Sequence, residues 1–151
     1  MNSPDAAAAF TAMLHAIDAR NWQGVRSAFT ERVEMDYSSL FGGTPETVVA
    51  DHHIDGWHAF ADAFDATQHV TGPIIVTPND AGVTAHTHVR AYHYLKGAVW
   101  MVAGHYEVRL VAVAEVWKIA AITLTVFYQE GNLTLPERAR ARAASSARST
   151  S

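Results

Sequence analysis

The chain contains no cysteine among its 151 residues. This absence excludes a disulfide framework, a thiolate nucleophile and any cysteine-ligated zinc or iron–sulfur site. No apolar run approaches the roughly 18 residues that a membrane span needs. The first five residues also lack the basic start of a signal peptide. We therefore expect a cytoplasmic protein with no membrane partner.

Charge divides the chain into two parts. Residues 1–135 contain 7 Lys+Arg and 14 Asp+Glu, a net −7, whereas residues 136–151 contain four Arg and one Glu, a net +3. The acidic body argues against nucleic-acid binding. The segment 136–151 is rich in Ala, Arg and Ser and has no large apolar side chain. We therefore expect a single domain over residues 1–135, followed by a disordered tail over residues 136–151.

The spacing of apolar residues predicts helices in the first half of the chain and strands in the second. Helical spacing predicts a first helix through Phe10, Leu14 and Ile17, a short second helix capped by Asn21, and a third over residues 46–66. Alternating residues predict strands over 33–40, 70–76, 83–95, 99–113 and 115–128. This order predicts an α+β fold, with one curved antiparallel sheet packed on the N-terminal helices.

Asp18 and His69 form the first candidate pair for chemistry. Asp18 lies on or beside the apolar stripe of the first helix, where an unpaired carboxylate would be costly. It could cap the second helix, or it could orient a histidine. His69, at the entry to the sheet, is the natural partner, because an imidazole held by a carboxylate is a competent general base near pH 7. A purely structural role for His69 is the alternative.

Tyr37 and His93 form the second candidate pair, because each faces the apolar side of its own strand. A phenol or an imidazole inside an apolar cavity can donate a hydrogen bond to a developing enolate or oxyanion. The alternatives are a core tyrosine bonded to the backbone and a histidine at the rim of the sheet.

The chain has nine histidines, and several lie outside these pairs. His86 and His88 form an H-x-H pair on one strand face, but Arg90 shares that face and would repel a cation. We therefore predict no metal site. The same face carries Tyr92 and Tyr94, and its aromatic, lightly charged character suits a subunit interface. We expect a homo-oligomer, either a dimer or a trimer.

Six short segments resemble a known family in their order and spacing. They are Ile17-Asp18-Ala19-Arg20-Asn21-Trp22, Met35-Asp36-Tyr37-Ser38-Ser39-Leu40, Thr67-Gln68-His69, Val89-Arg90-Ala91-Tyr92-His93, Gly104-His105-Tyr106 and Val116-Trp117-Lys118-Ile119. Together they resemble the SnoaL-like branch of the nuclear transport factor 2-like superfamily, and most closely the scytalone dehydratase-like lyases. The resemblance covers roughly residues 6–132.

The resemblance implies a cone-shaped α+β barrel with a deep apolar pocket and cofactor-free chemistry. It also implies that Asp18 and His69 form the base pair, with Tyr37 and His93 beside them. Two departures from scytalone dehydratase concern the substrate. Ile17 replaces a tyrosine, and Gly104 and Tyr106 stand where that enzyme has a serine and an asparagine.

The combined interpretation is a lyase that needs neither cofactor nor metal and that performs a dehydratase-like elimination. Its substrate would be a small cyclic or polyketide-like apolar molecule held by Phe10, Val33, Met35, Trp57, Phe60, Tyr106 and Phe127. One alternative is an isomerase or cyclase that uses the same proton shuttle. Another is a non-catalytic small-molecule-binding module, in which His69 and Asp18 would lie too far apart to form a hydrogen bond.

Overall fold

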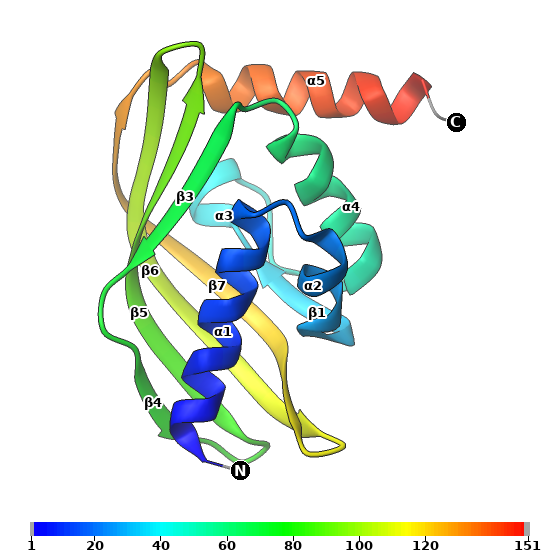
Figure 1. Cartoon of the computed structure of the whole chain (residues 1–151), viewed down its shortest axis with the longest axis vertical. Coiled ribbons are helices and arrows are strands. Elements are labelled where there is room, and N and C mark those ends of the chain that lie inside the picture. The colour runs from blue at the N-terminus through cyan, green and yellow to red at the C-terminus, as the bar shows by residue number, and fades with distance from the viewer. Residues whose placement is uncertain (1, 150–151) are drawn as a thin grey trace.

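A computed structural model describes residues 2–149 of the chain (Figure 1). The elements over this range are, in order, α1 (Ser3–Asp18), α2 (Trp22–Ser27), β1 (Phe29–Asp36), α3 (Ser38–Phe41), β2 (Glu46–Val49), α4 (Ala50–Ala61), β3 (Ala66–Thr71), β4 (Ile75–Pro78), β5 (Val83–Leu95), β6 (Ala98–Val113), β7 (Val116–Gly131) and α5 (Leu135–Ser149).

The strands form one curved sheet in the order β2-β1-β7-β6-β5-β3, and β4 pairs with β5 beside β3. The neighbouring strands are antiparallel except β1 and β7, which run parallel. Helices α1, α2 and α4 lie on one side of this sheet (Figure 1). The predicted α+β fold, a curved sheet packed on N-terminal helices, is confirmed, and the sheet is mixed and unclosed.

The alternation in β5 explains which face of the sheet is buried. Its odd-numbered side chains, from Val83 to His93, are buried beneath the helices, and its even-numbered side chains lie on the outer face. The α1 stripe packs against this inner face, with Phe10 and Met13 almost fully buried. The core therefore fills the concave side of the sheet, and the site can form only in the space that the core leaves open.

Several element boundaries differ from the prediction, and three of these differences have clear local reasons. The helix expected from residue 46 begins at Ala50, because residues 46–49 pair as strand β2 with β1. The strand expected over 33–40 ends at Asp36, whose side chain accepts hydrogen bonds from the backbone N and the hydroxyl of Ser38 and so starts α3. The strand expected over 70–76 is split into β3 and β4 by Gly72-Pro73.

The predicted disorder of the tail is wrong up to residue 149, because this segment forms helix α5. Leu135 and Ala139 are each only 2% exposed and pack with Phe64, Trp100 and Val102. The decisive anchor, Leu135, lies one residue before the segment whose composition suggested disorder. The last two residues of the predicted tail, 150 and 151, lie outside the described residues.

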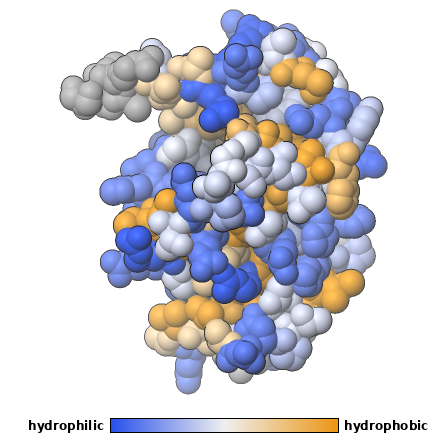
Figure 2. All heavy atoms as spheres, turned by 180° about the vertical axis from the view of Figure 1, so that it is seen from behind, coloured by the Kyte–Doolittle hydropathy of each residue, from blue (hydrophilic) through white to orange (hydrophobic). Residues whose placement is uncertain are grey.

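The outer face of the sheet combines polar and apolar residues. Val70, Ile75, Phe127 and Tyr128 are exposed there, and Figure 2, taken from behind the view of Figure 1, shows apolar patches separated by polar ones. The predicted homo-oligomer stays a prediction. Across residues 2–149, no helix is both long enough and apolar enough to cross a membrane.

Candidate active site

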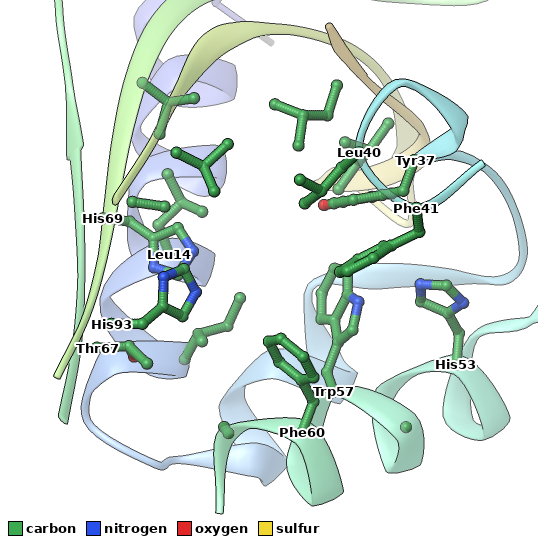
Figure 3. A pocket seen from close by; sticks show the side chains of 18 of the residues that line it. Leu14, Tyr37, Leu40, Phe41, His53, Trp57, Phe60, Thr67, His69 and His93 are labelled. Atoms are coloured by element: carbon green, nitrogen blue, oxygen red, sulfur yellow. The ribbon is translucent and has the colours of Figure 1, made fainter. Parts of the chain in front are cut away.

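A cavity of about 510 Å³ lies between the inner face of the sheet and helices α1, α3, α4 and α5 (Figure 3). Most of its lining is aliphatic or aromatic. The polar exceptions are Tyr37, His52, His53, Thr67, His69, His93, Tyr106 and Arg140. A cavity of this volume can enclose a small ring compound.

All four predicted catalytic residues meet at this cavity. Tyr37, His69 and His93 line it, and Asp18 bonds to His69 from behind. Asp18 is the last residue of α1, and His69 lies in β3. Figure 3 shows His69 and His93 on one side of the space, with Tyr37 and Trp57 across from them.

The Asp18 carboxylate holds His69 through both of its oxygens. Oδ1 lies 2.8 Å from the His69 ring Nδ1, and Oδ2 accepts a hydrogen bond of 2.7 Å from the His69 backbone N. The carboxylate acceptor places the ring proton on Nδ1. Nε2 is then the free nitrogen of a histidine that lines the cavity. The distance expected for a non-catalytic binding module, too long for a hydrogen bond, is not observed.

Thr67 and Arg20 support this pair from behind. The Thr67 hydroxyl donates to Asp18 Oδ1 at 2.9 Å. The Arg20 guanidinium donates to the backbone oxygen of Ala61 at 3.0 Å and reaches the Thr67 hydroxyl at 3.5 Å. Burial raises the pKa of Asp18, but the hydrogen bonds from His69 and Thr67, together with the charge interaction with His69, outweigh burial, so the pKa lies below its ordinary value. Asp18 is therefore a carboxylate at neutral pH.

His93 lies deeper in the wall than His69. It is 7% exposed, its ring stacks on Trp100 with centroids 4.2 Å apart, and its Nδ1 lies 3.3 Å from the Trp100 backbone oxygen. Burial, together with the nearby His69, lowers the pKa of His93 to about 4. His93 is therefore neutral at pH 7, with Nδ1 as the donor, and its Nε2 can accept a hydrogen bond.

Two tyrosines supply hydroxyl donors to the same cavity. Burial raises the pKa of Tyr106 to about 12. Burial also raises the pKa of Tyr37 well above its ordinary value, and the neighbouring Tyr106 raises it further. Both phenols remain protonated at neutral pH and can donate to an oxygen atom that gains negative charge.

Comparison with known proteins shows the family to which the chain belongs. Residues 5–123 match the SnoaL-like domain family. The chain belongs to this family. The predicted resemblance to the SnoaL-like branch is thereby confirmed. No curated protein sequence matches the chain significantly.

Solved structures share the SnoaL-like fold over most of the chain. The Kfla4162 protein from Kribbella flavida is 29% identical, with a TM-score of 0.82 over 89% of this chain and 95% of that one. A Novosphingobium aromaticivorans DSM 12444 protein provisionally named a scytalone dehydratase is 17% identical, with a TM-score of 0.73 over 85% and 86% of the two chains. A hexachlorocyclohexane dehydrochlorinase, LinA type 2, is 14% identical, with a TM-score of 0.69 over 82% and 84%. At these identities, the last two comparisons establish the fold alone.

The seven predicted substrate contacts divide into two groups. Trp57, Phe60 and Tyr106 line the cavity. The other four do not, so their prediction as cavity lining is wrong: Phe10, Val33, Met35 and Phe127. The first three are buried in the core behind the wall, whereas Phe127 is 60% exposed on the outer face, beside His88. The register shift in the β6–β7 pairing between Ile119 and Ala121 reverses the simple alternation of β7, so that Leu124 faces inward and Phe127 faces outward.

The two departures from scytalone dehydratase have structural consequences in this SnoaL-like chain. Ile17 lines the cavity, so an apolar side chain occupies the place where scytalone dehydratase has a tyrosine. Gly104 pairs with β7, and a Cβ atom there would lie 2.4 Å from the Thr125 carbonyl oxygen. Backbone crowding at Gly104 therefore leaves no room for a serine, and Tyr106 supplies the hydroxyl from this strand.

Sequence reasoning did not assign roles to His53 and Arg140, which also line the cavity. His53 Nε2 is buried without a hydrogen-bond partner in the described part of the chain, and burial lowers the pKa of this ring. The adjacent pair His52-His53 was a weak signal for this site. Arg140 gave no signal, because it lies in the segment expected to be disordered.

The outer histidines are separate from this site. His86 and His105 stack with ring centroids 5.5 Å apart, and His88 meets His105 at 5.9 Å. Within residues 2–149, no group of three His, Asp or Glu side chains is arranged to hold a metal ion.

Proposed function

We propose that this SnoaL-like protein is a cofactor-independent lyase in which His69 is the general base. The observation that carries this proposal is the 2.8 Å contact between His69 Nδ1 and Asp18 Oδ1 at the wall of an apolar cavity. This contact fixes the tautomer and leaves Nε2 free to remove a proton. A positioned general base of this kind contributes about 10²–10⁴-fold to a reaction rate.

The reaction is an elimination of water. His69 Nε2 takes a proton from a carbon next to a carbonyl or an electron-poor ring, and the Asp18 carboxylate stabilises the resulting imidazolium. The electron pair from the broken C–H bond forms the new C=C bond as the hydroxyl leaves. The leaving hydroxyl takes up a proton, which the imidazolium can return, so the product is an alkene and one water.

Tyr37 and Tyr106 stabilise the charge that develops during this step. Both hydroxyls are protonated at neutral pH because burial raises their pKa values. They can donate to the carbonyl oxygen of the substrate as it gains negative charge. His93, which is neutral and bonded through Nδ1 to the backbone, positions the substrate by accepting a hydrogen bond at Nε2.

The apolar lining favours a small cyclic or polyketide-like substrate. Trp57, Phe60 and Trp100 provide aromatic surface, and the fold shared with a protein provisionally named a scytalone dehydratase is consistent with a ring compound. An isomerase or cyclase would use the same proton transfer without a leaving group. The mass of the product distinguishes these alternatives from the lyase.

The test is a screen of cyclic β-hydroxyketones with product detection by mass spectrometry. We expect wild-type protein to convert at least one compound to a product lighter by one water, and His69→Ala to lose this activity while keeping its fold by circular dichroism. Full activity of His69→Ala would exclude His69 as the base. Products of unchanged mass would show that the protein is an isomerase or cyclase and not a lyase. Binding without conversion of any compound would favour a binding module.

A further inference from the structure

We propose that Arg140 binds an anionic group, such as a carboxylate, on the ligand of this cavity. This inference rests on the proposed function, which identifies the end of the ligand that reacts at His69. It adds the chemistry of the ligand's opposite end. Among the described residues that line the cavity, Arg140 is the single Lys, Arg, Asp or Glu side chain. The lining therefore carries one permanent positive charge and no carboxylate.

The position of Arg140 is at the rim of the cavity. Leu40, Phe41 and Arg140 line both the cavity and a second, outer hollow of about 690 Å³. A residue shared by an inner space and an outer one lies where the two meet. A ligand that enters from the outer hollow would therefore pass the guanidinium group.

The guanidinium is held in place by an aromatic ring and has no ion-pair partner. Its Cζ lies 4.8 Å from the centroid of the Phe41 ring, a cation–π contact. Phe41 is in turn fixed by Phe60, with ring centroids 6.0 Å apart. Within residues 2–149, no carboxylate lies at ion-pair distance from Arg140, although Glu137 borders the outer hollow. The planar donor fork thus remains available for a bidentate carboxylate.

Phe41 lies across the cavity from the proposed base. Figure 3 shows Phe41 and Leu40 on the side opposite His69 and His93. A ligand bound at both ends would present its acidic C–H to His69 and its anion to Arg140. Its apolar middle would lie between them against residues such as Trp57 and Phe60. The inferred ligand class is therefore a ring compound with a carboxylate at one end.

The charge distribution of the chain supports the same ligand class. The body to residue 135 carries a net −7 and repels anions, whereas residues 136–151 carry a net +3. Helix α5 places part of this positive charge at the rim of the cavity. Local positive charge at an entrance raises the local concentration of anions, and the effect weakens with added salt.

The test compares two probes of the same shape, 2-naphthoate and 2-naphthylmethanol, by isothermal titration calorimetry. We expect wild type to bind 2-naphthoate about fivefold more tightly or better. Arg140→Met keeps the stem over Phe41 but removes the charge, and should reduce the preference below about twofold. Arg138→Met, the matched control on the same helix, does not line the cavity and should keep the preference.

Three results would overturn the inference: no carboxylate preference in wild type, an unchanged preference in Arg140→Met, or an equal loss in Arg138→Met. The last would mean that the field of the whole helix is responsible. Arg140→Gln serves as the second variant if Arg140→Met is not folded by circular dichroism. The preference should persist in His69→Ala, so a failed base assignment and a failed anion site give different results.

Discussion

The carboxylate of Asp18 accepts hydrogen bonds from both the ring and the backbone N–H of His69, 51 positions later in the chain. The bond to the ring fixes the orientation of the imidazole, and the bond to the backbone N–H fixes the strand that carries it. The pair joins the end of α1 to β3, so the proposed base is held by two separate elements of the fold. A rigid base of this kind needs little reorganisation when a proton is transferred.

Replacing Asp18 by asparagine should reduce turnover of the substrate found in the screen by about 10²–10⁴-fold. An amide has one acceptor oxygen and cannot satisfy both N–H groups of His69, so the ring loses its fixed tautomer. Steady-state kinetics of Asp18→Asn measure the effect. Asp55→Asn removes a carboxylate that pairs with Arg26 on the exposed surface and serves as the control, with unchanged turnover. Turnover of Asp18→Asn within threefold of wild type would contradict the role of Asp18.

His93 should make the fold less stable as the pH falls from about 6.5 to about 4. Its pKa is lowered from 6.5 to about 4 in the fold, so the unfolded chain binds the proton first within that window. The stabilisation from the neutral ring is complete above pH 6.5 and is lost as the pH falls, and it amounts to about 3 kcal/mol. Urea denaturation at pH 7 and pH 4.5 should show a smaller decrease for His93→Phe than for wild type. Equal decreases would mean that other groups account for the pH dependence.

Gly104→Ser should destabilise the protein by about 1–3 kcal/mol, even though serine occupies the corresponding place in scytalone dehydratase. The new Cβ would lie 2.4 Å from the Thr125 carbonyl oxygen, so the β6–β7 pair would have to move. Gly56→Ala is the matched control, because a Cβ at this helical glycine meets nothing within 4 Å. Thermal and urea unfolding should separate the two variants. A Gly104→Ser protein as stable as wild type would show that the strands adjust without cost.

Leu135→Ala should cost about 2–4 kcal/mol and should loosen α5. Leu135 is 2% exposed, whereas Leu133, two residues earlier, is 57% exposed. Leu133→Ala should therefore stay within about 0.5 kcal/mol of wild type. Hydrogen exchange of residues 136–149 measures the loosening. Slow exchange that is unchanged by Leu135→Ala would show that other contacts hold the helix.

The predicted homo-oligomer should depend on the outer face of the sheet. Ile75 and Phe127 are 65% and 60% exposed there, and an arginine at either position would oppose close packing of two copies. Sedimentation velocity should show a dimer or trimer for wild type and a smaller species for Ile75→Arg and Phe127→Arg. Val113→Arg, near the β6–β7 turn, is the control. A monomeric wild type would contradict the predicted oligomer. An oligomer that neither change affects would show that the subunits meet through another surface.

The elements that could be predicted are those in which one pattern dominates. The strand expected over 83–95 is observed as β5 with the same bounds, because strict alternation leaves one register that buries Val83, Val89 and His93. Alternation within each predicted strand also placed Tyr37, with Val33 and Met35, and His93, with Val83 and Val89, on the inner side of the sheet. Asp18 was recognised because a carboxylate on an apolar stripe requires a partner.

Contacts between distant segments could not be predicted from the sequence. Phe10, Val33 and Met35 are buried as expected, but their patterns do not separate core from cavity wall. That distinction depends on how far the sheet curves over α1. Phe127 lies outside because of a local irregularity in pairing, which alternation alone does not reveal.

The sequence by itself determined the fold class and the residue types of the proposed base pair, because these follow from periodicity and from the cost of burying an unpaired charge. The family was indicated separately, by the resemblance of six short segments to SnoaL-like proteins. Only the tertiary structure decided that Asp18 and His69 bond at 2.8 Å and that His53 and Arg140 share their cavity. It also decided that residues up to 149 form a helix anchored by Leu135. These features depend on packing between segments far apart in the chain, and local patterns do not encode such packing.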